Sequence, residues 1–529
     1  MEKFFNTEGP VNPSMHYIMP PLGRIEWPEI EHLLQQQKYF LLHAPRQTGK
    51  TTAMLAMVER LNQQGDYHAL YANIEAAQTA RNDADKGNRI ICDTLMQSGE
   101  LFFNEPLPWG EIRDKLSTIE PQQRLSQLLS WWAINSTKPI VLLLDEVDAL
   151  IGDTLISLLR QLRAGYSQRP HAFPHSVILC GVRDIKDYRI HQGNGEIITG
   201  GSAFNIKAKS LTMGNFTQQE IKTLYQQHTE ATGQSFDNAI FDQLWPDTHG
   251  QPWLVNALAY QMTWEERELR DRSRPVTLQH YYAARERLIQ SRATHLDQLA
   301  DKLREERVHR VIAPILTGES IEQHDSDLQY CQDLGLIRTR PHLAISNRIY
   351  REILPRELTY GLQASIANQE QQWYLTGDNR LNMVKLLQAF QHFFRENAES
   401  WIERFDYKEA GPQLLLQAFL QRIINGGGRL NREYALGRRR TDLIIEWPTT
   451  AQGYFGDIQR IVIELKILRG ELEQIITEGI EQTLDYADKA DAGECHLMIF
   501  NRNPDTPWDK KIWQQQRSNG QQTITVWGA

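Results

Sequence analysis

Residues 38–52, KYFLLHAPRQTGKTT, contain a short apolar run, a loop and the start of a helical pattern. The run from Lys38 to His43 predicts a strand. From Thr51 to Leu61 there is no Pro or Gly, and apolar side chains recur at helical spacing. In a strand–loop–helix unit, backbone N–H groups of the loop converge and the helix dipole adds partial positive charge. The stretch therefore predicts an anion-binding loop.

The loop spells A-P-R-Q-T-G-K-T, which resembles the P-loop of nucleoside triphosphatases with alanine at the first glycine position. The resemblance implies that Lys50 reaches the β- and γ-phosphates of ATP and that the Thr51 hydroxyl ligates Mg²⁺. The alternative is a chance Gly-Lys-Thr before a helix. The residues expected to cradle the nucleotide are Ala44, Pro45, Arg46, Gln47, Thr48, Gly49, Lys50, Thr51 and Thr52.

A second apolar run, Pro139-Ile-Val-Leu-Leu-Leu, ends in Asp145 and Glu146. A continuous apolar run is typical of a strand buried on both faces, and ligands bind where such strands end. An acidic pair after a strand is weak evidence alone, but it gains weight downstream of the P-loop pattern. We expect Asp145 to hold Mg²⁺ through water and Glu146 to polarise the attacking water.

Composition bounds the class of protein. The chain has 529 residues and a formal net charge of -9, so nucleic acid would have to bind to local patches. The start, MEKFFNTEGP, lacks the apolar core of a signal peptide, and no apolar run approaches the roughly 18 residues that span a bilayer. Four widely spaced cysteines fit neither a metal motif nor a disulfide framework. We expect a cytoplasmic protein that has no membrane partner.

Further strands are predicted over residues 67–74, 177–182 and 204–211, with helices between them. This order predicts an α/β fold with a parallel sheet and resembles the AAA+/STAND branch of P-loop ATPases. The branch carries a sensing residue at the end of the fourth strand, where this chain has Arg183 or Asp184; a structural salt bridge is the alternative. The resemblance also implies a homo-oligomer.

The middle of the chain predicts helices and a smaller module. Thr217 and Glu220 form a capping-box pattern, and Gly250-Gln-Pro252 resembles a motif in the helical lid of STAND ATPases. A helix ending at Gly335 followed by two short strands suits a winged helix, which would either bind DNA or pack and regulate. The proline-rich segment 17–24 predicts an extended strap, which either covers the domain or contacts a nucleotide base.

A second polar constellation lies near the C-terminus. The run RIVIELKIL, residues 460–468, predicts a strand on which Glu464 and Lys466 share one face among apolar neighbours. Buried charges are costly unless they pair or bind metal. With Asp442 on an adjacent strand, the acids can hold a divalent cation, and Lys466 can orient water or stabilise charge.

This Asp442…Glu464-x-Lys466 pattern resembles the PD-(D/E)xK nuclease superfamily. Gln482-Thr-Leu-Asp-Tyr486 matches the Q-x-x-x-Y of its RecB-like members, and Thr441 stands where the family often has proline. The resemblance implies a Mg²⁺ or Mn²⁺ site formed by Asp442 and Glu464. An additional acid would come from Glu433, or alternatively from a helical glutamate at 403 or 409. A salt bridge between Glu464 and Lys466 at a solvated strand end is the other interpretation.

The sequence thus predicts four parts: a P-loop ATPase core at 1–212, a helical lid at 213–290, a winged-helix-like module at 291–375 and a PD-(D/E)xK domain at 376–529. The function expected is an ATP-regulated, metal-dependent nuclease, with DNA favoured over RNA as its partner. Defence against foreign DNA is suggested by analogy only. The alternatives are a nucleotide-dependent binding switch whose C-terminal domain does not cut, and a motor, for which no helicase motif is recognisable.

Overall fold

The computed structural model separates into two compact units, Met1–Lys302 with Glu322–Arg351, and Leu303–Ile321 with Glu352–Ala529. The residues that it describes are 2–102, 109–183, 189–191, 197–199, 205–290, 302, 305–317, 325–351, 353, 374–404, 415–417, 419–420, 424, 428–431, 443–450, 452–501, 503, 505–518 and 523–529.

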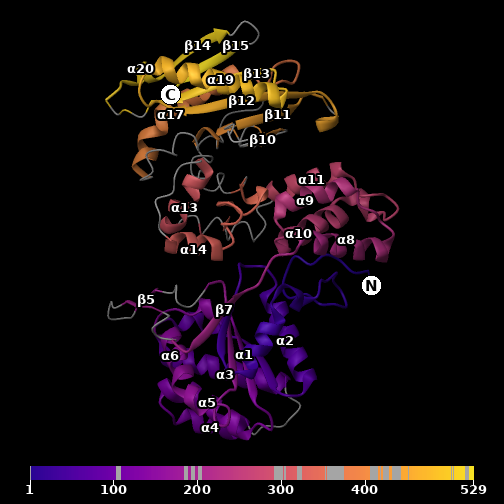
Figure 1. The fold of residues 1–529 in the computed structure, drawn as a ribbon, viewed down its shortest axis with the longest axis vertical. Coiled ribbons are helices and arrows are strands. Elements are labelled where there is room, and N and C mark those ends of the chain that lie inside the picture. The colour runs from indigo at the N-terminus through magenta and orange to yellow at the C-terminus, as the bar shows by residue number, and fades with distance from the viewer. Residues whose placement is uncertain are drawn as a thin grey trace. The chain divides into compact units, whose positions relative to one another are not determined.

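The first unit is built around a parallel sheet of five strands in the order β2-β3-β4-β1-β7. Figure 1 labels the edge strand β7 of this sheet. The predicted α/β fold with a parallel sheet is confirmed. In chain order the strands are β1 (Tyr39–His43), β2 (His68–Asn73), β3 (Ile140–Asp145), β4 (Ser176–Gly181) and β7 (Lys207–Thr212). Strands β1, β3 and β4 are buried along their whole length, as continuous apolar runs require.

Helices cover both faces of this sheet. Successive side chains of β1 point to opposite faces, so they belong to two different apolar clusters. Phe40 and Leu42 pack in one cluster with α1 and α2, whereas Tyr39 and Leu41 pack in another with α3, α5 and α6. The helices are α1 (Trp27–Gln35), α2 (Lys50–Gln64), α3 (Ala84–Phe102), α4 (Trp109–Ser117), α5 (Pro121–Asn135) and α6 (Gly152–Ala164). Short elements are η1 (Pro21–Arg24), η2 (Glu75–Ala80), η3 (Val147–Ala149), η4 (Gly165–Gln168) and the hairpin β5 (Arg189–His191) with β6 (Ile197–Thr199).

A helical region follows β7. It contains α8 (Gln218–Thr232), α9 (Asn238–Thr248), α10 (Pro252–Tyr260), η6 (Gln261–Glu265), η7 (Arg267–Arg270) and α11 (Leu278–Gln290). The predicted capping box is present: Glu220 N donates to Thr217 Oγ1, and Thr217 N donates to Glu220 Oε2 at 2.7 Å. Gly250 has φ +72°, and a Cβ there would lie 1.9 Å from Phe216 O. Only glycine fits this close approach of two backbones.

Helix α14 (Asp325–Asp333) and the antiparallel pair β8 (Ile337–Arg338) and β9 (Ala344–Ile345) also belong to the first unit. The predicted helix, glycine turn and return strand are present, with Gly335 at φ +76°. A Cβ on Gly335 would lie 2.8 Å from Pro45 Cγ, so this turn rests against the 44–52 loop. No described helix is both long and apolar enough to cross a membrane.

The second unit has a mixed sheet in the order β10-β11-β12-β13-β15-β14. Strands β10, β11 and β12 are antiparallel, β12 is parallel to β13, and β13 is parallel to β15. The elements are α13 (Glu306–Thr317), α17 (Met383–Arg404), β10 (Arg429–Asn431), β11 (Leu443–Pro448), η8 (Gly453–Phe455), β12 (Ile458–Ile467), α19 (Leu472–Ala490), β13 (Glu494–Phe500), α20 (Trp508–Lys511), β14 (Trp513–Ser518) and β15 (Thr523–Gly528).

Helices α17 and α19 cover opposite faces of this sheet. Val462, Leu497 and Ile499 share an apolar cluster with α19. On the other face, the ring of Phe394 of α17 meets Phe500 at 5.6 Å, and Gln391 Nε2 donates to Gly528 O. Residues 462, 464 and 466 therefore lie on the α19 side of β12.

Candidate functional site

The loop between β1 and α2 has the backbone of a phosphate-binding turn. Gln47 and Gly49 have φ of 56° and 88°, and Thr48 Oγ1 donates to Pro45 O at 2.8 Å. The φ of Gly49 lies in the region that side chains rarely adopt, which explains the glycine there; a Cβ would also lie 2.9 Å from Arg24 Nη2. Helix α2 begins at Lys50, so its unpaired N–H groups face the loop.

Lys50 folds back over this loop. Its Nζ donates to Ala44 O and Pro45 O, both at 3.0 Å, and the residue is 7% exposed. The ammonium group is thereby placed on the backbone ring that would surround a phosphate. Arg46 and Gln47 are exposed on the loop, and Thr52 Oγ1 accepts from Val11 N at 3.1 Å.

Asp145 and Thr51 are brought together from β3 and α2. Asp145 is fully buried, and its Oδ2 accepts from Thr51 Oγ1 at 2.8 Å and from Tyr71 OH at 3.0 Å. Its Oδ1 accepts from Glu146 N at 2.9 Å. A hydroxyl and a carboxylate at the start of a helix are the oxygen donors that Mg²⁺ takes in nucleotide sites, so these residues fit the ion.

Glu146 follows at the end of β3 with φ of 58°, in the left-handed region. Burial, followed by the charge of Asp148, raises the pKa of Glu146, although Lys50 opposes the shift. Asp148 in turn accepts from Val182 N at 3.2 Å and so links the ends of β3 and β4. A carboxylate with a raised pKa near a phosphate site suits a general base.

Arg183 follows β4 and lies over the ring of Tyr330 in α14, with its guanidinium carbon 5.0 Å from the ring centroid. Asp184, its neighbour, lies outside the described residues. The sequence patterns did not single out Tyr330 as a contact of Arg183.

Two further residues of the site were not predicted from the sequence patterns. Tyr71 contacts Asp145 from the neighbouring strand, and burial together with the Asp145 charge raises the pKa of its hydroxyl. Arg24 Nη1 donates to Thr48 O at 2.6 Å and Gly214 O at 3.1 Å, and burial lowers the pKa of Arg24 to about 10. Arg24 thus ties the segment before α1 to the loop. The sequence predicted an extended strap over residues 17–24, whereas its last four residues form the 3₁₀ helix η1, and no pattern pointed to Arg24 itself.

A cavity of about 120 Å³ opens beside the loop. The loop contributes Gln47, Thr48 and Gly49, the helical region after β7 contributes Phe216 and Trp253, and the N-terminal segment lines another part of the cavity. Trp253 Nε1 donates to Thr7 O at 3.0 Å. The cavity is mostly apolar, as a site for a nucleoside would be.

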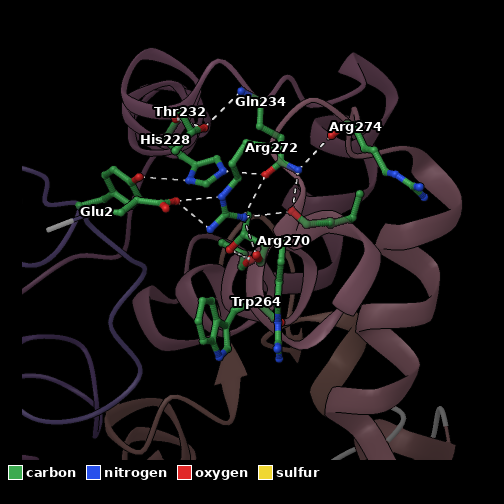
Figure 2. Close-up of polar contacts among 12 residues, drawn as sticks. Glu2, His228, Thr232, Gln234, Trp264, Arg270, Arg272 and Arg274 are labelled. Carbon is green, nitrogen blue, oxygen red and sulfur yellow. Dashed lines mark hydrogen bonds and ion pairs between the residues drawn. The ribbon is translucent and has the colours of Figure 1, made fainter.

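Polar contacts attach the N-terminal segment to the helical region after β7 (Figure 2). Arg272 binds Glu2 at 2.7 Å and donates to Thr263 O at 2.6 Å, while His228 Nε2 lies 2.9 Å from Gln234 Oε1. His228 Nδ1 also lies 3.1 Å from Tyr17 OH. These contacts attach the N-terminal segment, which lines one side of the cavity, to the helical region.

The second polar cluster lies between β12 and α19. Lys466 Nζ binds Glu464 Oε1 at 2.9 Å and donates to Gln482 Oε1 of α19. The Glu464 side chain is 3% exposed and that of Lys466 is 27% exposed, while Tyr486 is buried in the α19 cluster. The three residues predicted on the strand and helix are therefore in contact.

The remaining acids predicted for this cluster, Glu433 and Asp442, lie outside the described residues. Described strand β11 starts at Leu443, which pairs with Ile463. Within the part of the chain that the structure describes, no group of three or more His, Cys, Asp or Glu side chains is arranged to hold a metal.

Known proteins are similar to a large part of this chain. A family model described as an AAA-like domain matches residues 8–354. Among solved structures, the chain is similar to a Walker-type ATPase of Pyrococcus abyssi, with 12% identity, 66% of this chain and 99% of that chain covered, and a TM-score of 0.44. It is also similar to Cdc6p of Pyrobaculum aerophilum, with 13% identity, coverage of 66% and 97%, and a TM-score of 0.35. RuvB of Thermotoga maritima gives 13% identity, coverage of 61% and 91%, and a TM-score of 0.31. No curated protein matches the sequence.

Proposed function

The chain belongs to the family of AAA-like domains, and we propose that its P-loop unit binds and hydrolyses ATP to control a metal-dependent nuclease in the second unit. The contact between Glu464, Lys466 and Gln482 is the observation that carries the nuclease half. The family match over residues 8–354 supports the ATPase half.

In the ATPase, each residue has a defined task. Lys50 and the N–H groups at the start of α2 bind the β- and γ-phosphates, and Glu146 accepts the proton of the attacking water. Thr51 and Asp145 would hold Mg²⁺, which neutralises charge on the phosphates. The raised pKa of Glu146 supports its role, because a stronger base takes that proton more readily.

The second unit supports a nuclease through its topology. An α17–β10–β11–β12–α19–β13 order places three antiparallel strands before a parallel crossover, and the polar cluster lies where α19 covers β12. The PD-(D/E)xK resemblance implies the Glu464-x-Lys466 motif on a strand and Gln482 on a following helix, and this order is compatible with both. A buried carboxylate beside a lysine is costly in a sheet unless it serves pairing or chemistry.

At this site Asp442 and Glu464, with Glu433 as an additional acid, would hold Mg²⁺ or Mn²⁺, which polarises the scissile phosphate. Lys466 donates to the phosphate oxygen on which negative charge develops. Gln482 accepts a hydrogen bond from Lys466 and so fixes the direction of its ammonium group. Gln482 is therefore a positioning residue.

Cleavage of labelled DNA and RNA with Mg²⁺ or Mn²⁺, with and without ATP, tests this proposal. We expect Glu464→Gln, Lys466→Ala and Asp442→Ala each to reduce cleavage by about 100-fold or more. The matched control is Glu481→Gln, since Glu481 is exposed on α19 next to Gln482. Lys50→Ala should change the dependence of cleavage on ATP. Cleavage that survives Glu464→Gln would refute the assignment.

The alternative is a switch that binds nucleic acid or protein without cutting. The ion pair between Glu464 and Lys466 is compatible with this function as well. Binding of DNA that depends on ATP, with no cleavage by the wild-type chain under any metal, would select the switch. We further propose defence against foreign DNA as the biological role. Equal phage sensitivity of cells that carry wild type or Asp442→Ala would contradict that role.

A further inference from the structure

A second cavity lies in the three-helix insertion between β2 and β3, among α3, α4 and α5. Its volume is about 280 Å³, and it shares no residue with the cavity beside the P-loop. Helix α5 packs against both α3 and α4, so the cavity is lined by elements of one compact unit.

The lining of this cavity has two chemical parts. Its apolar part comes from Cys92, Met96 and Leu116, all buried. Burial raises the pKa of the Cys92 thiol to about 12, so Cys92 is neutral and apolar in character. A ligand must therefore present a small apolar group to this side.

The polar part of the lining comes from Arg89, Arg113 and Arg124, together with Asp93 and Ser117. Arg124 Nη1 binds Asp85 at 2.6 Å and Arg89 Nη2 binds the same carboxylate at 3.3 Å. Arg113 is exposed and makes no hydrogen bond or ion pair with another residue that the structure describes. Arg124 Nε also donates to Leu116 O at 3.1 Å and to Ile119 O at 3.0 Å. Arg113 is therefore the one of these three arginines whose charge is uncommitted among the described residues.

Charge balance indicates the kind of ligand. Three arginines against one aspartate, Asp93, leave the lining with a surplus of positive charge, which Asp85 reduces but does not remove. Arginine forks bind phosphate and carboxylate oxygens in pairs. A phosphate monoester carries close to two negative charges and has three peripheral oxygens, so it suits three guanidinium groups better than a carboxylate does.

We propose that this cavity binds a small organic phosphate, with its phosphate on Arg89, Arg113 and Arg124 and its apolar group on Met96 and Leu116. The site would lie on the ATPase unit but apart from the P-loop. Its occupant would also compete with Asp85 for Arg89 and Arg124.

Calorimetric titration of the full chain with phenyl phosphate tests the proposal, with Lys50→Ala in every protein so that the P-loop does not contribute. We expect binding that is tighter than for inorganic phosphate or benzoate, and that weakens with salt. Adding Arg113→Ala should weaken it about tenfold or more, because a charge-assisted hydrogen bond is lost. Arg160→Ala, which removes an exposed arginine of α6, is the matched control and should change affinity less than about twofold.

Thermal unfolding checks that each variant is folded, and Arg89→Ala replaces Arg113→Ala if the latter is not. Absence of phenyl phosphate binding at millimolar concentration would overturn the proposal. So would equal affinities of the Arg113→Ala and Arg160→Ala proteins. Tighter binding of benzoate than of phenyl phosphate would overturn the assignment to phosphates.

Discussion

Single residues determine the geometry of the nucleotide site. Asp145 is central to it, because several hydrogen-bond donors point to its carboxylate. One of its oxygens accepts hydrogen bonds from both Thr51 and Tyr71. We expect Tyr71→Phe to lower the free energy of unfolding by about 1 kcal/mol, because a buried carboxylate loses one hydrogen bond. Urea denaturation measures this. Tyr67→Phe is the control, since the Tyr67 hydroxyl makes no hydrogen bond with a described residue. Equal losses in both variants would contradict the assignment.

Glu146→Gln should separate ATP binding from hydrolysis. Turnover should fall by about 100-fold or more because the general base is lost, whereas nucleotide affinity should persist.

The pKa of Glu146 is raised in the folded chain, so ionisation of this carboxyl destabilises the fold as pH rises. The Gln variant should therefore be the more stable protein at neutral pH, and the difference should vanish below the ordinary value of 4.5. A gap in stability that persists in acid would show that another effect is responsible.

At the scale of elements, the junction between β7 and the helical region that follows it depends on Gly250. Ala at this position would put Cβ 1.9 Å from Phe216 O in addition to requiring φ of +72°. At Gly233, φ is +78° but nothing lies within 4 Å, so Gly233→Ala isolates the cost of the backbone conformation. We expect Gly233→Ala to cost about 1 kcal/mol and Gly250→Ala to cost at least about 2 kcal/mol more. Thermal denaturation compares them, and equal costs would mean that the loop relaxes freely.

At the same scale, the elements that depend on local sequence patterns could be predicted from the sequence. Strands such as β3 were predictable because a run buried on both faces is apolar throughout, and the Thr217 cap because its pattern is local. Tyr71 and Arg24 were not, because each acts through a contact between segments far apart in the chain: Tyr71 with Asp145, and Arg24 with Gly214. In the second unit, alternation placed Glu464 and Lys466 on one face of β12. The family resemblance placed Gln482 on the helix after β12, but its contact with Lys466 was not predicted, because that contact joins two separate elements.

At the scale of the whole molecule, the arginines of the P-loop unit bear on assembly. Arg24 is committed to Thr48 O and Gly214 O, and Arg183 lies over the ring of Tyr330. Phosphoryl transfer often uses an arginine to stabilise charge in the transition state, and that residue can come from another chain. We therefore propose that copies of this chain associate when ATP is bound, so that one copy supplies an arginine to the next.

Light scattering coupled to size-exclusion chromatography measures this association. We expect Glu146→Gln, which binds ATP without turning it over, to form the larger species with ATP and Mg²⁺, while Lys50→Ala keeps the mass of the nucleotide-free protein. Hydrolysis per chain should rise with protein concentration, because a shared site forms only in the assembly. A mass that does not depend on nucleotide, together with turnover that is independent of concentration, would show that each chain completes its own site. In that case Arg183 would have to leave the Tyr330 ring during the cycle, and Tyr330→Ala would then be expected to raise turnover.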